Sequence, residues 1–388
     1  MKKIGNSFKG ILGGFVFIII AIVALWWNEG NNVKNIKTTK EMEELVVDIS
    51  SDKIDSAYEG KLIATHGKLL NEETLEDKEF EVSLVTPKLV RNVEMYQWEE
   101  DSSTDDDGNT TYSYSKKWSS TIIDSGNFHN SGHENPAIMP YHNETYIASD
   151  VKVGAFTLNT DQKNDLSTNK DYRDLKVEVA TRLNYTIADK YYTSSQDISN
   201  PEIGDVRISF VYNDSTDVSI LAVQIGDTFT EYTSSVGKKE SRIMDGIHTG
   251  KDMINVIKKE NNLIKWIIRA AGTLFIILGF ATILKPISTI TGYVPILGSI
   301  VSGVVGIVSF ILGVCLSLVV IAIAWIRFRP ILGICLLAAV VALFILLKKV
   351  LKKKKENAPS ETVVQSETPE VVPNTPQEVE QPSEENHE

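Results

Sequence analysis

Residues 301–326 read VSGVVGIVSFILGVCLSLVVIAIAWI, an apolar run without a charged side chain. As an α-helix rising about 1.5 Å per residue, such a run is long enough to cross about 30 Å of hydrocarbon. Further apolar runs occupy residues 11–27, 263–284 and 331–347, the last only just long enough. The chain is therefore predicted to be a membrane protein with four transmembrane α-helices and a large, mostly-β (α+β) extramembrane domain between the first two.

The apolar runs also divide the 388-residue chain into segments. We expect a cytoplasmic N-terminus (1–10), transmembrane helix 1 (11–27), an exoplasmic or lumenal β-rich domain (28–262), transmembrane helix 2 (263–284), a cytoplasmic loop (285–300), transmembrane helix 3 (301–326), a short exoplasmic turn (327–330), transmembrane helix 4 (331–347), and a basic juxtamembrane segment with a disordered acidic cytoplasmic tail (348–388).

Lysines at both ends of the apolar region predict its orientation. Lys2, Lys3 and Lys9 precede the first run, and a lysine cluster within residues 348–355 follows the last. Because cytoplasmic loops carry the excess of Lys and Arg, both termini are expected in the cytoplasm. The bulky pair Trp26-Trp27 stands where a signal peptidase requires small residues, so the first run is predicted to be a retained anchor.

Four side chains are predicted to lie at the exoplasmic membrane interface: Trp27, Trp266, Arg269 and Trp325. Indole rings prefer this level of the bilayer. Arg269 lies a few residues inside the second run, where a cation is costly unless it reaches the interface or pairs with a carboxylate. We expect its side chain to extend to the interface, with an ion pair to the domain as the alternative.

Between the first two runs the pattern changes from helical to strand-like. After a polar connector, a short helix is predicted over residues 39–47, with Thr38 as its cap and Glu41 completing a capping box. Another helix is predicted over residues 249–262, capped by Thr249 and leading straight into the second transmembrane run. Stretches rich in β-branched and aromatic residues predict strands at residues 61–65, 80–84, 93–99, 111–117, 175–185, 206–212 and 218–225.

The net charge of −12 comes from the middle domain and the tail. Residues 356–388 are rich in Glu and Pro and lack aromatic residues, so they are predicted to be disordered, either as a docking segment or simply as a solvated tail. The dense basic run lies next to the membrane, where attraction to anionic lipid explains it, and we expect no nucleic-acid partner. Cys315 and Cys335 both lie in apolar runs, so no disulfide is expected in the domain.

Motifs for catalysis or metal binding are incomplete. The acidic run at 105–108 resembles a calcium loop, but Tyr114 stands where a bidentate Glu is required, so we interpret the run as a hairpin turn. His129 and His133 are four residues apart, yet the Gly and Pro residues around them interrupt any helix that would align them. We therefore predict no catalytic residues, no cofactor and no metal, although a carboxylate-pair hydrolase stays open as the least favoured class.

Two groups of residues are predicted to mediate packing or assembly. Small side chains recur on one face of the third transmembrane run, where they allow close approach of a helix of this chain or of a second copy: Ser302, Gly306, Ser309, Gly313 and Ser317. An aromatic group in the domain is expected to form a sheet face or, alternatively, a partner surface: Tyr96, Trp98, Tyr112, Tyr114 and Trp118.

Short motifs spread along the chain resemble those of one known family. They are VEMYQWE at 93–99, NEG at 28–30, EGKL at 59–62, YSY at 112–114, GDVR at 204–207 and RAAG at 269–272. In this order they are similar to the transmembrane protein 43 family, also called LUMA. The resemblance implies four spans, a large loop between the first two, and both termini in the cytoplasm. Eukaryotic members of the family self-associate and help organise the nuclear envelope through emerin and lamins.

The leading hypothesis is a non-enzymatic integral membrane scaffold that contacts the lipid bilayer, forms homo-oligomers and binds other membrane or envelope proteins. A membrane-tethered ligand sensor or a transport-associated protein is the alternative. As a multi-pass protein it is expected in the cell membrane of a bacterium, or in the endoplasmic reticulum and inner nuclear membrane of a eukaryote.

Overall fold

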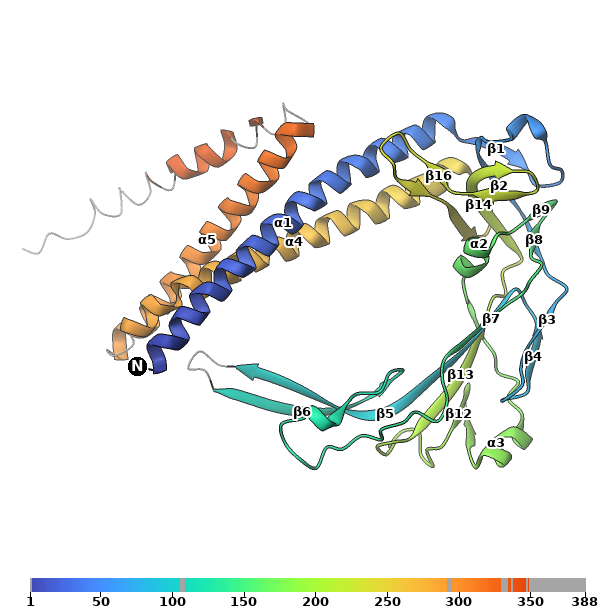
Figure 1. Ribbon diagram of the computed structural model, residues 1–388, viewed down its shortest axis with the longest axis horizontal. Helices are drawn as coiled ribbons and strands as arrows, with labels where there is room; N and C mark the ends of the chain where they lie inside the picture. The colour runs from blue at the N-terminus through green and yellow to red at the C-terminus, as the bar shows by residue number, and fades with distance from the viewer. Residues whose placement is uncertain are drawn as a thin grey trace, which may run out of the picture.

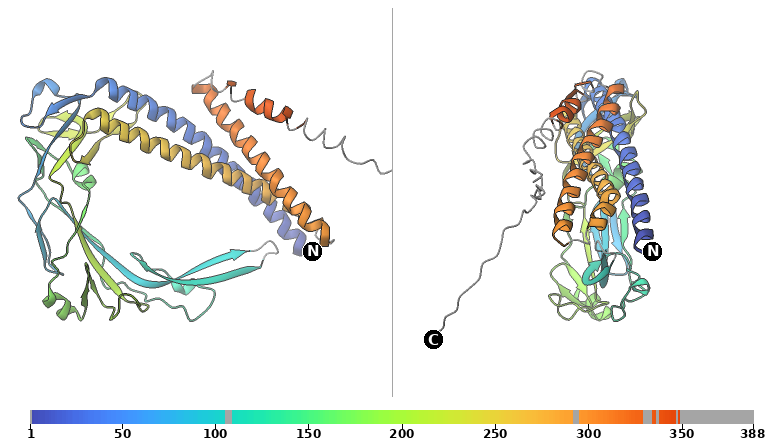
Figure 2. Two further views of the ribbon diagram at one scale, coloured as in Figure 1. Left: turned by 180° about the vertical axis from the view of Figure 1, so that it is seen from behind. Right: turned by 90° about the vertical axis from the view of Figure 1, so that its left-hand side faces the viewer.

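The computed structural model describes residues 2–104, 109–291, 295–328, 334–335, 338–346 and 348. Three long helices and a β-rich domain build it (Figure 1). The helices are α1 (Lys2–Leu45), α4 (Gly250–Thr291) and α5 (Pro295–Phe328). Both α1 and α4 run side by side into the domain, and the edge-on view in Figure 2 shows helices and domain in one narrow slab.

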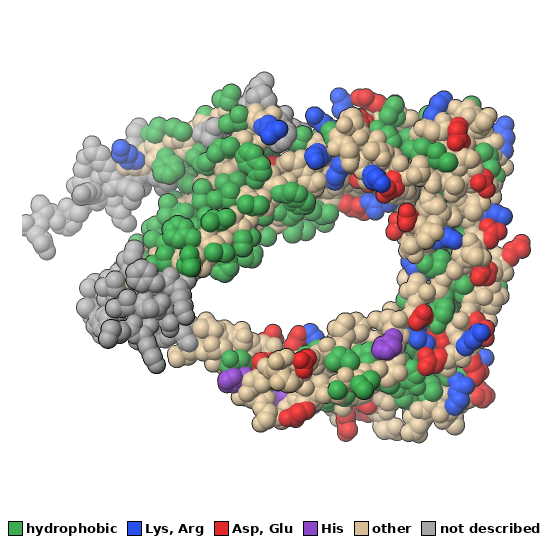
Figure 3. Space-filling model, viewed as in Figure 1, with side chains coloured by type: hydrophobic (Ala, Val, Ile, Leu, Met, Phe, Trp, Pro, Cys, Tyr) green, Lys and Arg blue, Asp and Glu red, His purple; other side chains and the backbone are tan. Residues whose placement is uncertain are grey.

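Apolar side chains gather on one half of the helix bundle. They cover α5 and the adjoining parts of α1 and α4, whereas charged side chains gather on the other half and over the domain (Figure 3). Within the described part of the chain, three helices are long and apolar enough to cross a membrane: Gly10–Leu45, Gly250–Pro286 and Val304–Arg327. These agree with the first three predicted spans. The fourth, at 331–347, lies partly outside the described residues, and residues 338–346 within it are helical.

The polar connector predicted after Trp27 is instead a continuation of α1, which is helical to Leu45. Thr38 therefore caps no helix: it lies buried inside α1 and its hydroxyl donates to Ser234 Oγ at 2.8 Å. By contrast, the predicted start of the second domain helix is confirmed. The Thr249 hydroxyl accepts a hydrogen bond from the Asp252 N–H at 3.2 Å, and α4 continues without a break into the second span.

Glycines let α1 and α4 cross closely within the apolar half. A Cβ added at Gly14 would meet the Gly279 carbonyl oxygen at 2.6 Å, and one added at Gly279 would meet the Gly14 oxygen at 2.8 Å. Ile18, Ala21, Leu25, Ile276 and Val320 form a buried cluster among the three helices. Since lipid offers no hydrophobic drive for helix association, this close packing is what holds the spans together.

The domain consists mainly of two sheets. The first is mixed, because β1 is parallel to β2, and the second is antiparallel. One contains β15-β14-β2-β8-β9 in spatial order, with β1 beside β2 and β18 beside β14, and the other contains β11-β12-β13-β5-β6, with β10 beside β13 and β7 beside β5. The strands of the first sheet are β1 (Val47–Ser50), β2 (Leu62–Leu70), β8 (Lys152–Val153), β9 (Phe156–Thr157), β14 (Asp217–Ile225), β15 (Thr228–Thr230) and β18 (Arg242–Asp245). Those of the second are β5 (Lys88–Thr104), β6 (Thr110–Ser119), β7 (Glu144–Ile147), β10 (Lys170–Asp171), β11 (Thr186–Ala188), β12 (Tyr191–Thr193) and β13 (Val206–Tyr212).

Smaller elements complete the domain. Two short hairpins pair β3 (Thr74–Asp77) with β4 (Val82–Val85) and β16 (Tyr232–Thr233) with β17 (Lys239–Glu240). The short helices are α2 (Thr160–Asp165), α3 (Val177–Leu183), η1 (Ser56–Tyr58) and η2 (Ser125–Asn127). Residues from both sheets share one core that includes Ile63, Val93, Phe156, Phe210 and Ile220.

Most predicted strands are confirmed, but residues 175–185 are not one strand. The structure has α3 there, with Val179 and Ala180 buried and Asn184 closing the helix in the left-handed conformation at φ 56°. Asn tolerates this conformation better than most residues and can therefore end a helix. The strand predicted at 93–99 is longer than expected, because β5 continues at both ends and pairs with β6 to form an arm that turns back beneath the helices (Figure 1).

Candidate functional site

An ion pair is buried among the three long helices at the end of their apolar half. The Arg269 guanidinium of α4 donates to Glu29 of α1 through Nε at 2.6 Å and through Nη2 at 2.8 Å. The Trp325 indole N–H of α5 also donates to Glu29. The Glu29 side chain is fully buried and that of Arg269 is 9% exposed.

Indole rings cover the remaining faces of the cation. The Arg269 guanidinium lies 4.9 Å from the centre of the Trp266 ring and 5.2 Å from that of Trp325. Aromatic faces attract a cation more strongly when water is excluded. The guanidinium is thus satisfied by Glu29 and two indoles and not by extension to solvent, so the expected snorkelling is wrong. The alternative, an ion pair, is confirmed: its carboxylate, Glu29, falls within residues 28–262 that were predicted as the domain, although the structure places it on α1.

These contacts bring Trp266, Arg269 and Trp325 to the same level of the bundle. Trp27 is two positions before Glu29 in the sequence. The sequence interpretation missed Glu29, because it assigned residue 28 onward to the domain. A signal was present. A lone arginine inside a span requires a carboxylate, and Glu29 directly follows the first apolar run.

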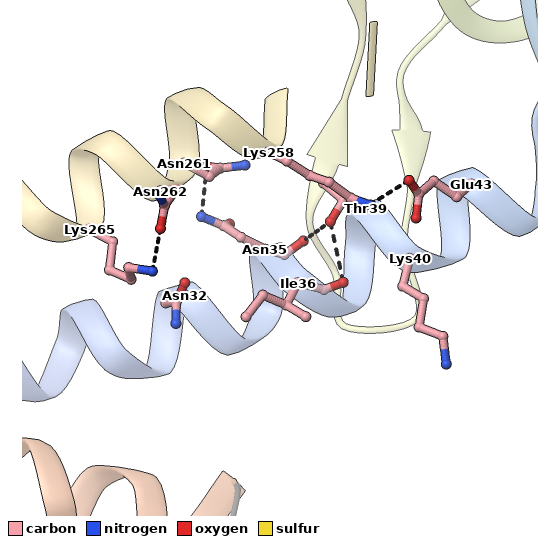
Figure 4. A pocket seen from close by; sticks show the side chains of 10 residues that line it. All are labelled: Asn32, Asn35, Ile36, Thr39, Lys40, Glu43, Lys258, Asn261, Asn262 and Lys265. Carbon is pink, nitrogen blue, oxygen red and sulfur yellow. Dashed lines mark hydrogen bonds and ion pairs between the residues drawn. The ribbon is translucent and has the colours of Figure 1, made fainter. Parts of the chain in front are cut away.

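A polar groove of about 550 Å³ lies farther along α1 and α4, toward the domain (Figure 4). Amide and amino side chains dominate its lining: Asn32, Asn35, Ile36, Thr39, Lys40, Glu43, Lys258, Asn261, Asn262 and Lys265. The Asn35 side-chain amide donates to Asn261 Oδ1 at 2.7 Å, and Lys258 pairs with Glu43 at 2.5 Å. These bonds join the two helices outside their apolar half and leave a groove able to offer amide and ammonium groups to a polar ligand.

The five aromatic residues singled out in the domain lie on one face of the β5–β6 arm. Cross-strand partners there include Tyr96 with Trp118, whose ring centres are 5.2 Å apart. The segment around η2 folds over this face: the His133 ring stacks on Tyr114 at 3.7 Å, and the His129 ring stacks on Tyr112 at 4.0 Å. Trp98 completes the group, with its ring edge-on to His133 at 4.7 Å.

Hydrogen bonds hold the segment around η2 against the aromatic face of the arm. The Tyr114 hydroxyl donates to Glu100 Oε2 at 2.6 Å, and the His129 N–H donates to the same oxygen at 2.5 Å. The hydrogen bond from Tyr114 and that from the His129 backbone lower the pKa of Glu100 from its ordinary value. The two histidines therefore pack on tyrosines, and among the described residues no group of three or more His, Cys, Asp or Glu side chains could hold a metal ion.

A buried arginine within the domain is also fully partnered. Arg91 Nη1 donates to Asp77 at 2.8 Å and to Glu79 at 2.9 Å, and its Nε donates to the His142 carbonyl at 2.9 Å. The Tyr146 hydroxyl donates to the same Asp77 carboxylate at 2.9 Å, and burial together with this carboxylate raises the pKa of Tyr146. The cluster ties β3, β5 and β7 together, which is a structural arrangement.

The small residues of the third span do not form one uniform surface. Gly313 faces α4, since an added Cβ would meet Ile277 Cγ1 at 2.4 Å, and Ser309 and Ser317 are also buried. Gly306, in contrast, has no atom of the described residues within 4 Å of an added Cβ. The side chain of Ser302 lies outside the described residues.

Comparison with known proteins identifies the family. The sequence profile of the Transmembrane protein 43 family matches residues 95–330. The chain is 28% identical to mouse (Mus musculus) Transmembrane protein 43 over 351 residues, covering 85% of this chain and 87% of the relative. The human (Homo sapiens) protein is 28% identical over 357 residues with the same coverage, and the Drosophila melanogaster homolog is 26% identical over 351 residues, covering 84% of this chain and 91% of the relative.

No solved structure matches the chain significantly. The profile match covers the domain from residue 95 onward, α4 and α5. On the strength of the profile match, which spans more than half of its length, the chain belongs to the Transmembrane protein 43 family.

Proposed function

We propose that this protein is a non-enzymatic integral membrane scaffold, which holds its β-rich domain in a fixed position relative to the bilayer and assembles with further copies of itself. The observation that carries the proposal is the continuity of α1 and α4. Each is a single helix that extends from the apolar half of the bundle into the domain. A hinge between membrane and domain is thereby avoided in both connections.

Contacts at both ends support a rigid connection. At the domain end, Met42 of α1 and Met253 and Ile254 of α4 pack against strand residues such as Leu62 and Leu221 in one buried cluster. At the other end, α1 and α4 cross closely at Gly14 and Gly279, and between the two ends the Glu29–Arg269 pair joins the same helices. A helix pair fixed at both ends transmits its orientation to the domain, as a scaffold requires.

The part of α5 around Gly306 is the surface that we propose for self-association. Gly306 is open, and exposed Ile307 and Phe310 flank it. Small residues beside large apolar ones are typical of helix contacts in membranes, because they let backbones approach closely. Gly313, about two turns farther along the same face of the helix, is already covered by α4 of the same chain.

Gly306 and Gly313 therefore form a matched pair for a test. Light scattering in detergent and single-molecule photobleaching in bilayers would measure the number of subunits. We expect Gly306→Leu to lower that number with the thermal stability unchanged, whereas Gly313→Leu should lower stability because it collides with Ile277. A wild-type monomer in bilayers, or an unchanged oligomer in Gly306→Leu, would contradict self-association through this face.

The polar groove supports a second candidate function, ligand sensing by the juxtamembrane helices. Its four asparagines and three lysines suit hydroxyl-rich or anionic ligands. A ligand in the groove would stabilise the folded protein in proportion to the logarithm of its concentration. Thermal unfolding in a panel of soluble sugars and sugar phosphates would test this: stabilisation lost in Asn261→Leu supports sensing, and no shift with any of them argues against it.

A further inference from the structure

A lysine outside the polar groove sets the direction of a hydrogen-bond chain inside it. Lys238, in the turn between β16 and β17, donates through Nζ to Asn35 Oδ1 at 2.5 Å. Since an ammonium can only donate, the Asn35 oxygen must face Lys238, and its amide N–H groups must face elsewhere. Asn35 accordingly donates through Nδ2 to Asn261 Oδ1 at 2.7 Å, on the opposite wall of the groove (Figure 4). The chain therefore ends at Asn261 Nδ2, which can only donate.

A second lysine orients a neighbouring amide in the same way. Lys265 Nζ donates to Asn262 Oδ1 at 2.5 Å, so the Nδ2 group of Asn262 is kept for another acceptor. Within the described part of the chain, neither Asn261 Nδ2 nor Asn262 Nδ2 donates a hydrogen bond, and the Asn32 side chain forms none. The unused amide groups of the groove are thus mainly donors, and they come from both helices. A ligand that suits them must supply acceptors.

The ammonium at the start of the chain favours a negatively charged acceptor. Lys238 forms no ion pair with a carboxylate of the described residues, although its charge acts on Glu240. Asn35, which carries the chain across, is 7% exposed. Hydrogen bonds in series polarise one another where little water is present, so the Lys238 charge makes the Asn261 N–H a stronger donor. The carboxylate in the groove lining, Glu43, is already paired with a lysine.

We propose that the groove binds a soluble phosphate monoester, with its phosphate oxygens on the amide N–H groups of Asn261, Asn262 and Asn32. This inference rests on the proposed ligand-sensing role and names its ligand. A phosphate carries three acceptor oxygens and can therefore use donors from both helices at once. At about 30 Å³ per water molecule, the groove of about 550 Å³ has room for roughly eighteen waters, enough for a sugar attached to the phosphate.

The position of the groove indicates a ligand from solution. Along α1, the Asn35–Asn261 bridge lies about 9 Å beyond Glu29, toward the domain. The groove continues from there to Glu43 and Lys258, still farther from the apolar half of the bundle. A phosphate bound at the bridge would thus approach from the solvent side of the interfacial tryptophans.

Glucose 6-phosphate and glucose are the matched probes, since they differ only in the phosphate. Isothermal titration calorimetry on the full chain in detergent would measure the Kd of each. We expect the wild type to bind glucose 6-phosphate at least about tenfold more tightly than glucose, the effect of one charge-assisted hydrogen bond. Asn261→Leu removes the donor at the end of the chain and should abolish this preference.

Lys238→Met tests the hydrogen-bond chain itself, because Lys238 does not line the groove and would not touch the ligand. It should weaken the binding of glucose 6-phosphate about tenfold and leave the affinity for glucose unchanged. Lys239→Met is the matched control: Lys239 lies in the same hairpin, is exposed and pairs with Glu231 at 3.0 Å. This variant should bind both probes as the wild type does.

Four outcomes would contradict the inference. Equal affinity of the wild type for both probes would refute the preference for phosphate and leave sugar sensing intact, whereas binding of neither would contradict ligand sensing as well. Equal affinity for glucose 6-phosphate in Lys238→Met and Lys239→Met would overturn the role of the chain. Thermal stabilisation by phosphatidic acid in nanodiscs, without binding of glucose 6-phosphate, would assign the phosphate to a lipid headgroup.

Discussion

Removing either partner of the Glu29–Arg269 pair should destabilise the protein strongly. Glu29→Gln leaves a guanidinium that is 9% exposed without its carboxylate, and the loss of one partner from a buried pair costs about 3–5 kcal/mol. Two indoles at 4.9 and 5.2 Å still contact the cation, and each such contact contributes about 0.5–1 kcal/mol or more. We therefore expect the lower end of that range, about 3 kcal/mol.

The reverse change should cost at least as much. Arg269→Met leaves the Glu29 carboxylate with the Trp325 N–H as its remaining partner among those described above. Combining Glu29→Gln with Arg269→Met removes both charges from an apolar setting, and removing both charges of a buried pair is often nearly neutral. The double variant should therefore be more stable than either single variant, and the coupling energy should be at least about 2 kcal/mol.

Reversible unfolding in mixed micelles, followed by tryptophan fluorescence against the mole fraction of dodecyl sulfate, would measure these free energies. The exposed pair between Lys40 and Glu44, at 3.8 Å, is the control. Lys40→Ala should cost less than about 0.5 kcal/mol, as surface pairs usually do. Single variants at Glu29 and Arg269 that cost under about 1 kcal/mol, or that add without coupling, would refute the structural role assigned to the pair.

Three further predictions follow from other contacts. Gly279→Val should cost about 2–3 kcal/mol in the same unfolding assay, since its Cβ meets Ile18 and the Gly14 backbone, while Gly13→Ala should not. The lowered pKa of Glu100 means that its contribution to stability is present above about pH 4.5 and lost as pH falls below it; amide hydrogen exchange near His129 should rise there in the wild type and less so in Glu100→Gln. If the lysine distribution sets the topology, an impermeant thiol reagent on intact cells should label a cysteine at Asn143 and leave one at Ser7 unlabelled.

The β-rich character of the domain could be predicted from local pattern alone. Strands such as β13 and β14 are rich in β-branched and apolar residues, and the centre of β14 is buried on both sides, so a local window is enough to identify them as strands. Residues 175–185 show the opposite case. Their valines favour a strand, but burial of Val179 and Ala180 against the core and the left-handed Asn184 select a helix. Tertiary packing decided there between two weak local preferences.

The extended α1 could not be predicted because its polar half has little intrinsic reason to be helical. Asn31, Asn32 and Asn35 are poor helix formers, and a polar connector was the natural interpretation. The helix persists because α4 packs beside it, through the Asn35–Asn261 hydrogen bond and the Lys258–Glu43 pair. Those partners are more than two hundred residues away in sequence, so no local window contains both.

Only one partner of the Glu29–Arg269 pair could be recognised from the sequence. Arg269 was recognised as a cation within a span, and Trp266 and Trp325 as interfacial rings, but their convergence on Glu29 required the relative rotation of three helices. That rotation depends on the close crossing at Gly14 and Gly279. Glycines in an apolar run give no indication of which partner they will meet.

The length of α1 gives the domain a mechanical relation to the bilayer. Its 44 residues correspond to about 66 Å of straight helix at about 1.5 Å per residue. Transmembrane helices change tilt to match the thickness of the hydrocarbon layer. A tilt change of about 10° would sweep the far end of such a rod through roughly 11 Å. Because α4 packs along α1, the two helices would tilt together, and a small change in membrane thickness would produce a large displacement of the β5–β6 arm.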